Sequence, residues 1–308
     1  AAPAAAEEDA SKATLGAFHR WLMAEVEAGN ISRQEEVSMV PPRVLDVRPG
    51  HRVLDMCASP GSKTQQLIEW LDGRGLVVAN DADRKRCHLM VSRASKLLSP
   101  LLFAINHDAR LLPEELTGAD GVAAPWRFDR VLCDVPCSGD GTLRKAPAIW
   151  RQWTVGSGNA LHRLQLQIAC KGARLLAVGG TLVYSTCSLN PVENEAVVAQ
   201  LLKEFGGSLA LVDVSSQLPQ LRRRPGLATW RVWHRAKWHD TWASMVDRFP
   251  RKCPRFETLF PPTAAEAAAM HLDRCLRLFP QDNDSGGFFV AVFEKVADHA
   301  PDAGALAP

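Results

Sequence analysis

Strand and helix signals alternate along most of this chain, and this alternation restricts the possible folds more than any other feature. Strand-like apolar runs lie near residues 52–56, 76–80, 102–106, 129–134 and 180–184. Amphipathic helical patterns fall between them, near 62–72, 83–98 and 160–177. Such alternation favours an α/β fold with a mostly parallel, doubly wound sheet. A last apolar run at 287–293 predicts an antiparallel edge strand.

The remaining segments divide the chain of 308 residues into regions. Apolar spacing predicts a helix over 14–29, and a cap at Asn190 with Pro191 behind it predicts another that ends near Phe205. We expect the following division: a disordered tail at 1–12, an N-terminal helical subdomain at 13–50, a catalytic domain at 51–296 and a disordered tail at 297–308. The chain does not begin with Met, so we expect a fragment of something longer.

The composition restricts which macromolecules or membranes this chain can bind, and in which compartment. The formal net charge is only +2, so a nucleic-acid footprint must be a local patch. Eight cysteines without a signal peptide predict reduced thiols in an intracellular compartment. No apolar run approaches the roughly 18 residues of a membrane helix, so we expect no membrane partner.

Two cysteines follow predicted strands. Cys137 lies in Asp134-Val-Pro-Cys-Ser-Gly, and Cys187 lies in Tyr184-Ser-Thr-Cys-Ser. Both are therefore expected at the carboxyl edge of the sheet, where open α/β folds bind ligands. A thiol there is a candidate nucleophile, and two thiols suggest a reaction that forms and then releases a covalent bond.

The first strand leads into a loop of small residues that opens a helix. The helix amides favour an anionic group, and the sequence matches neither Gly-x-Gly-x-x-Gly nor the phosphate loop. The candidate cofactor residues of this loop are Cys57, Ala58, Ser59, Pro60, Gly61, Ser62 and Lys63.

Three acids end successive strands. Asp81 is placed to hydrogen-bond ribose hydroxyls, and Asp108 suits the exocyclic amine of an adenine. With Asp134 and the glycine-poor loop, these acids fit S-adenosylmethionine as cofactor. The alternative is that strand-end aspartates cap helices.

Together these motifs resemble the Sun-domain RNA (cytosine-C5) methyltransferases, and among them the eukaryotic tRNA branch. The resemblance covers roughly residues 14–296. It rests on Asp55–Thr64, Ala79–Asp83, Leu132–Thr142 and Tyr184–Pro191, and also on Asn30–Glu35, Met270–Arg277 and Gly286–Val292.

The resemblance implies a Rossmann-like S-adenosylmethionine-dependent methyltransferase fold and an RNA substrate, most of all tRNA. It implies Cys187 as nucleophile and Cys137 as the releasing cysteine. The loop from Cys57 to Lys63 and the three acids then line the cofactor site. Nuclear or nucleolar residence is expected on the same ground. Larger members carry a further RNA-binding module with no counterpart here, so weak RNA affinity is expected.

The chemistry explains why this pattern needs a thiol. Cytosine C5 becomes nucleophilic once a thiolate adds to C6, and the thiol must be at least partly ionised. A helix that begins at Asn190 would help ionise Cys187. Asp134, if protonated or water-linked, could hydrogen-bond the N3 edge of cytosine. The reverse assignment has precedent, since DNA cytosine methyltransferases use a Pro-Cys cysteine. Those enzymes need Glu-Asn-Val on a strand, whereas Val192-Glu-Asn194 here opens a helix, so we favour Cys187.

Basic residues form the candidate RNA surface. A basic, tryptophan-rich insertion at 222–262 contains four tryptophans that either stack on bases or pack an irregular segment onto the core. The candidate RNA contacts are Arg144, Lys145, Arg33, Arg222, Arg223 and Arg224.

Other readings are weaker. An amino-group methyltransferase usually has Asp/Asn-Pro-Pro-Tyr/Phe at Asp134-Val-Pro-Cys137. A catalytically silent RNA-binding scaffold and an rRNA substrate are the remaining alternatives. No metal is expected, because a zinc site would lack a second pair of ligands. Cys133, Cys170 and Cys275 lie in apolar patterns and are expected in the core.

Overall fold

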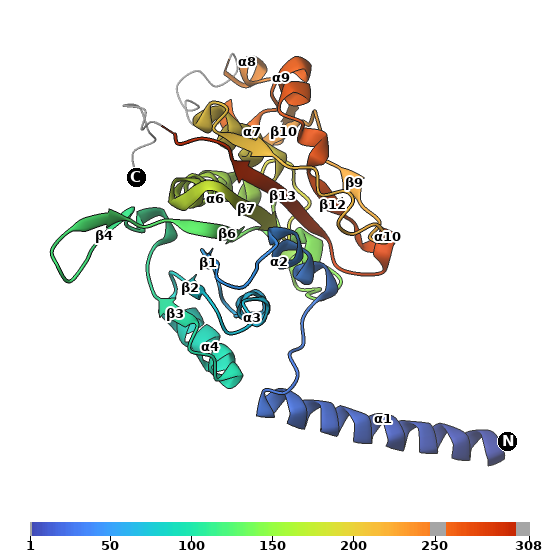
Figure 1. Ribbon diagram of the computed structural model, residues 1–308. Helices are drawn as coiled ribbons and strands as arrows, with labels where there is room; N and C mark the ends of the chain where they lie inside the picture. The colour runs from blue at the N-terminus through green and yellow to red at the C-terminus, as the bar shows by residue number, and fades with distance from the viewer. Residues whose placement is uncertain (1, 247–256, 300–308) are drawn as a thin grey trace.

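A mixed sheet of nine strands forms the centre of the structure, a computed structural model that describes residues 2–246 and 257–299. The strand order is β3-β2-β1-β6-β7-β13-β12-β9, and β8 also pairs with β13 (Figure 1). The strands are β1 (Arg52–Asp55), β2 (Leu76–Asn80), β3 (Leu102–Ile105), β6 (Phe128–Asp134), β7 (Leu176–Thr186), β8 (Leu209–Leu211), β9 (Arg224–Pro225), β12 (Leu276–Leu278) and β13 (Phe288–Lys295).

Five of these strands are parallel, as the sequence predicts. β3, β2, β1, β6 and β7 pair in parallel, and each overlaps its predicted range. β13 is antiparallel to β7, as expected, but its position at the edge was wrong. The short strands β12 and β8 pair with β13 and cover its far side. These three-residue strands carry too little apolar periodicity to be recognised in the sequence.

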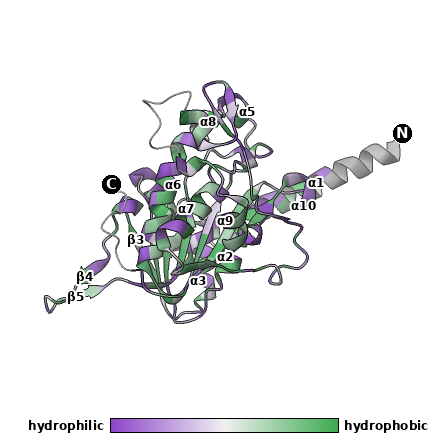
Figure 2. Ribbon diagram, turned by 90° about the horizontal axis from the view of Figure 1, so that it is seen from above, coloured by the Kyte–Doolittle hydropathy of each residue, from purple (hydrophilic) through white to green (hydrophobic). Residues whose placement is uncertain are grey.

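Helices cover both faces of the sheet, because adjacent residues of each central strand point to opposite sides. Leu54 and Tyr184 lie in a core with α6 and α7. Val53 and Val183 lie in a second core with α2, α3 and α4. Figure 2 shows apolar residues concentrated on the strands between these layers. The helices are α2 (Val40–Leu45), α3 (Ser62–Trp70), α4 (Arg84–Ala94), α6 (Val155–Leu175) and α7 (Glu195–Phe205).

The core also contains the three cysteines that were expected there. Cys133 and Cys275 are fully buried, and Cys170 is nearly so. Burial raises the pKa of the Cys133 thiol. These thiols are therefore packing residues, distinct from the pair at the sheet edge.

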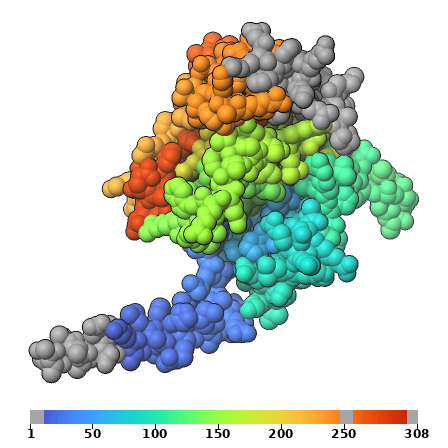
Figure 3. All heavy atoms as spheres, turned by 180° about the vertical axis from the view of Figure 1, so that it is seen from behind, coloured from blue at the N-terminus to red at the C-terminus, as the bar shows by residue number. Residues whose placement is uncertain are grey.

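Two elements project from this body. Helix α1 (Ala2–Ala28) stands away from it, and the hairpin of β4 (Glu115–Thr117) and β5 (Ala123–Pro125) extends from another side (Figures 1 and 3). Residues 2–12 of the expected tail instead belong to α1, since alanine-rich sequence has high helix propensity. α2 packs on the sheet, so the region 13–50 is two separate pieces. Most of the expected tail at 297–308 lies outside the described residues.

The remaining short elements surround the C-terminal half: α5 (Ile149–Gln152), β10 (Val232–His234), β11 (Lys237–His239), α8 (Trp242–Val246), α9 (Ala264–Ala269) and α10 (Pro280–Asn283). Within the described part of the chain, no helix combines the length and apolar character needed to cross a membrane.

A buried ion pair joins the antiparallel strands to α7. Arg277 on β12 donates to Glu195 at 2.6 and 2.8 Å, and both side chains are buried. Arg277 also donates to the Leu189 carbonyl, in the loop that follows Cys187. The ion pair therefore connects strand β12 to helix α7 and to the loop that follows Cys187.

Replacing Arg277 by leucine should destabilise the fold by about 3–5 kcal/mol, because Glu195 is left charged and buried without its cation. Denaturant unfolding measures this loss as a shift of the midpoint. The double variant Arg277→Leu with Glu195→Leu should recover most of it, since neither charge then remains. A single-variant loss below about 1 kcal/mol would contradict this account.

Candidate functional site

The two cysteines predicted at the sheet edge are in contact. β6 and β7 pair in parallel, with Asp134 opposite Ser185, so their carboxyl ends lie side by side. The loops that follow bring the Sγ atoms of Cys137 and Cys187 to 3.2 Å. Both thiols are free and partly buried. The structure thus places together two residues that are separated by fifty positions in the sequence.

A glycine fastens these loops to β13. The Gly141 N–H donates to the Cys187 carbonyl at 2.9 Å, and the Gly141 carbonyl accepts from the Gly287 N–H at 2.7 Å. A Cβ at position 141 would lie 2.7 Å from the Cys187 carbonyl oxygen. Only glycine therefore allows this approach of three backbone segments.

The two thiols differ in their tendency to ionise. The hydrogen bond from Cys137 lowers the pKa of Cys187, Lys63 lowers it further, and burial and Asp134 oppose both effects. The pKa of Cys137 is raised well above its usual value by the same hydrogen bond and by burial. Of the pair, Cys187 is therefore the cysteine that ionises more readily, and Cys137 the one that holds its proton more tightly.

The helix dipole does not contribute in the expected way. We expected a helix to begin at Asn190, but α7 begins at Glu195. Residues 191–194 form a turn, in which the Asn190 side chain accepts from the Val192 N–H at 3.2 Å. Such a side chain offers the backbone an alternative to helix geometry. The thiolate instead depends on Cys137 and Lys63.

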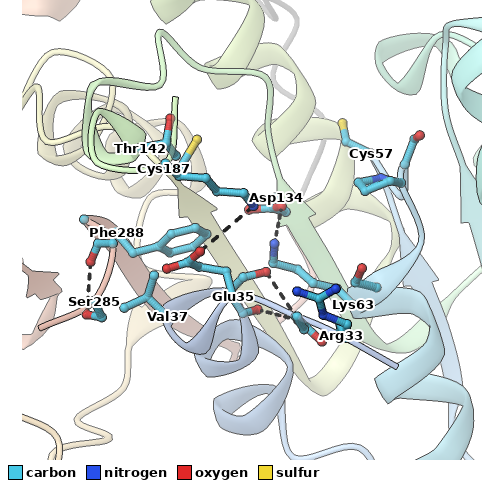
Figure 4. Close-up of a pocket in the computed structure, with 18 of the residues that line it drawn as sticks. Arg33, Glu35, Val37, Cys57, Lys63, Asp134, Thr142, Cys187, Ser285 and Phe288 are labelled. Atoms are coloured by element: carbon cyan, nitrogen blue, oxygen red, sulfur yellow. Dashed lines mark hydrogen bonds and ion pairs between the residues drawn. The ribbon is translucent and has the colours of Figure 1, made fainter. Parts of the chain in front are cut away.

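A pocket of about 630 Å³ opens beside Cys187. At its centre the Lys63 amine lies 2.7 Å from the Asp134 carboxylate, and Figure 4 shows these side chains pointing toward each other. Lys63 also lies over the Phe288 ring, 5.2 Å from its centroid. Asp134 is further held by the Ser185 hydroxyl at 2.7 Å. The size is typical of small-molecule sites.

Most predicted cofactor residues line this pocket. They are Cys57, Ala58, Ser59, Pro60, Ser62, Lys63 and Asp134. Gly61 lies behind them at the start of α3, with a φ of 100° that favours glycine.

Asp81 and Asp108 are not among the pocket-lining residues. Asp81 instead holds the loop of residues 57–63, since its carboxylate accepts from the Ser59 N–H at 3.3 Å. Asp108 pairs with Arg110 at 2.6 Å and caps a short helical turn, which is the alternative weighed in the sequence analysis. Their contact with a cofactor stays a prediction.

Asp55 is a pocket residue that the sequence analysis missed as a ligand. It is buried at the end of β1, and its Oδ2 accepts from the Thr64 hydroxyl at 2.8 Å. Its Oδ1 is buried with no hydrogen-bond partner in the described structure. Burial raises the pKa of Asp55 to about 7. An unpaired buried acceptor that lines a pocket fits a cationic ligand group.

Other pocket residues were also missed as site residues, although seven of them lie within the segments that carry the resemblance, Asn30–Glu35, Leu132–Thr142 and Gly286–Val292. They are Gln34, Glu35, Val37, Ser38, Arg93, Val135, Thr142, Asp284, Ser285, Gly286, Gly287 and Phe288. Gly286-Gly287 before an apolar strand was the available signal, since paired glycines permit close backbone approach.

The predicted RNA contacts fall in two places. Arg33, Arg144 and Lys145 line the pocket, and Arg144 pairs with the exposed Asp284 at 2.7 Å. The cluster Arg222–Arg224 lies elsewhere, where Arg224 pairs with Asp282 at 2.9 Å. The structure therefore does not bring the second set to the thiol pair.

The tryptophan-rich insertion packs on itself and onto the body of the protein, where its apolar residues cluster with Val192 and Ala196. Trp230 is buried and donates to the Leu259 carbonyl at 2.8 Å. Trp233 and Trp238 meet edge to face, and Trp242 lies against Phe260. Trp238 is 52% exposed. Residues 247–256 of this insertion lie outside the described residues.

Comparisons with known proteins identify the family. Residues 42–228 match the family described as 16S rRNA methyltransferase RsmB/F. The chain is 48% identical over 289 residues to the tRNA (cytosine(34)-C(5))-methyltransferase of Drosophila melanogaster, covering 90% of this chain and 38% of that protein. It is 46% identical to the multisite-specific tRNA:(cytosine-C(5))-methyltransferase trm4b of Schizosaccharomyces pombe, covering 91% and 44%.

Among solved structures, NSun6 from Pyrococcus horikoshii with SFG superimposes with a TM-score of 0.64 at 25% identity. The match covers 89% of this chain and 55% of that one. The chain thus spans about two-fifths of the curated relatives named above. With the fold, the thiol pair and the matched residues in agreement, the chain belongs to the RsmB/F methyltransferase family.

Proposed function

We propose that this chain is the catalytic core of an S-adenosylmethionine-dependent RNA cytosine-C5 methyltransferase that acts on tRNA. The observation that carries the proposal is the contact between two cysteine sulfurs beside the pocket, Cys187 with a lowered pKa and Cys137 with a raised one. The names of the Drosophila and fission-yeast relatives support tRNA as the substrate class. The alternative substrate class, which the experiment must distinguish from tRNA, is rRNA.

The pocket fits the proposed cofactor. The unpaired Asp55 Oδ1 suits the ammonium of its amino-acid part, and the amides at the start of α3 suit its carboxylate. The SFG ligand of the NSun6 structure, an analogue of S-adenosylmethionine, is consistent with this choice. When bound, the cofactor supplies an electrophilic methyl group.

The thiol pair supplies the covalent chemistry. The Cys187 thiolate adds to cytosine C6, which forms a carbon–sulfur bond and makes C5 nucleophilic. After C5 is methylated, a base removes the C5 proton, the C5–C6 double bond returns and Cys187 leaves as thiolate. Cys137 assists this release, because its sulfur lies 3.2 Å from that of Cys187 and its S–H can donate to the departing thiolate.

The remaining pocket groups position the base and the RNA. Asp134, held by Lys63 and Ser185, contacts the N3 edge of cytosine through a bridging water, because the carboxylate and N3 are both acceptors. A base can reach this pocket only when it leaves its stack. Arg33, Arg144 and Lys145 at the pocket wall neutralise nearby phosphates.

Cys187→Ala should abolish covalent trapping on RNA that contains 5-fluorocytidine, because no other pocket thiolate can add to C6. Denaturing gel electrophoresis measures the protein–RNA adduct. Cys133→Ala is the matched control, since it removes a buried core thiol on β6 and should leave trapping intact. Adduct formation by Cys187→Ala at the wild-type level would show that Cys187 is not the nucleophile.

Cys137→Ala should accumulate a stable adduct on unmodified RNA, because attack survives while release slows. It should also move the pH midpoint of adduct formation upward, since the Cys137 hydrogen bond is the largest effect that lowers the pKa of Cys187. Single-turnover trapping across a pH series measures both changes. An unchanged midpoint without accumulation would remove Cys137 from both roles.

Asp55→Asn should flatten the pH dependence of stability. Because the folded pKa of about 7 is raised above the ordinary 3.8, the folded state holds this proton more tightly. The free energy of unfolding therefore falls as pH rises between these values, by up to about 1.4 kcal/mol per unit, and levels off above pH 7. Urea unfolding at several pH values measures the slope. A slope equal to wild type would contradict the assignment.

A further inference from the structure

A buried carboxylate joins the two cysteine loops. Glu193 lies in the turn before α7 and has no exposed surface. Its Oε1 accepts from the Ser138 N–H at 2.8 Å, and its Oε2 accepts from the Ser138 hydroxyl at 2.5 Å and the Ser188 hydroxyl at 2.9 Å. Ser138 and Ser188 each directly follow one of the paired cysteines. One side chain therefore fixes both loops at the residue next to the thiol.

The surroundings of Glu193 supply hydrogen-bond donors to both carboxylate oxygens. Gln165 donates to Oε1 at 3.1 Å and Asn190 donates to Oε2 at 3.3 Å, so five donor groups converge on two oxygens. Among the described residues no Lys or Arg forms an ion pair with it. A carboxylate has only acceptor atoms. An amide or a protonated acid would instead place a donor N–H or O–H against these donor groups. The buried charge is held by hydrogen bonds alone.

The site is also closed by packing. A Cβ at Gly158 on α6 would lie 2.7 Å from Glu193 Oε2, so α6 leaves no room for a larger group. The Tyr184 hydroxyl donates to the Glu193 carbonyl at 2.6 Å, and Trp153 donates to the Ser138 hydroxyl at 2.9 Å. Both the backbone and the side chain of Glu193 are thereby fixed in place.

We propose that Glu193 is a positioning residue, whose carboxylate sets the contact between the two thiols and keeps their shared proton on Cys137. The inference rests on the proposed function, because it concerns the same thiol pair. It extends that function by naming the group that distinguishes the nucleophile from the releasing cysteine.

Electrostatics point in the same direction. After the hydrogen bond with Cys187 and burial, the negative charge of Glu193 contributes to raising the pKa of Cys137. Lys63, on the opposite side, lowers the pKa of Cys187. Asp134 acts on both sulfurs, whereas Glu193 raises the pKa of Cys137 and Lys63 lowers that of Cys187, so these two charges favour the proton on Cys137.

The test is site-specific alkylation of the 308-residue chain with iodoacetamide, without RNA or cofactor. Peptide mass spectrometry gives the pH midpoint of reaction for Cys137 and for Cys187 separately. In wild type the Cys187 midpoint should lie well below that of Cys137. In Glu193→Gln the two midpoints should approach each other, because Cys137 loses the neighbouring charge and Cys187 loses its donor. Glu193→Asp should give an intermediate separation, since it keeps the charge.

Glu195→Gln is the matched control. Glu195 is equally buried two residues away, but its carboxylate bonds Arg277 and the Leu227 N–H, and it reaches the loop after Cys187 only indirectly, through Arg277 and the Leu189 carbonyl. This variant should lower stability and leave the separation of midpoints unchanged. A wild-type separation in folded Glu193→Gln would overturn the proposal.

If Glu193→Gln does not fold, Ser138→Ala provides the test. It removes one hydroxyl donor and should narrow the separation in the same direction, and an unchanged separation would again overturn the proposal. The readout needs no methyl transfer. A chain that shows the predicted thiol shifts but never methylates RNA would therefore refute the proposed function and not this inference.

Discussion

The parallel pairing of β6 with β7 is the constraint on which the rest of the site depends. It sets Asp134 opposite Ser185, and the loops that leave these strand ends then meet at the thiol pair. Neither cysteine could be positioned by its own loop, because each depends on backbone hydrogen bonds from the other segments. The ligand edge expected for an open α/β sheet becomes a reaction site through this register.

Charge is distributed unevenly around that edge. Lys63 lies on the pocket side, near Cys187 and Asp134, while Glu193 lies behind Cys137. Two cysteines in contact therefore differ in pKa: that of Cys137 is raised and that of Cys187 is lowered. Separation of two like groups by their environments is a common way for enzymes to divide nucleophile and proton-holding roles.

The sequence predicted the parallel strands and the two strand-end cysteines, because strand periodicity and local motifs are short-range signals. It did not predict β12 and β8 beyond β13, which depend on long-range pairing of three-residue segments. It placed the start of α7 at Asn190, where a side-chain hydrogen bond makes a turn instead. The convergence of donors on Glu193 was not predicted either, because those donors come from distant parts of the chain.

The most direct measurement is the formation of 5-methylcytosine in tRNA and in rRNA incubated with the chain and isotopically labelled S-adenosylmethionine. Digestion followed by mass spectrometry identifies the labelled base. The account predicts labelled 5-methylcytosine in tRNA with the wild-type chain and none with Cys187→Ala. Labelled 5-methylcytosine formed equally by both proteins, or a complete lack of transfer by a wild-type chain that binds both cofactor and tRNA, would contradict it.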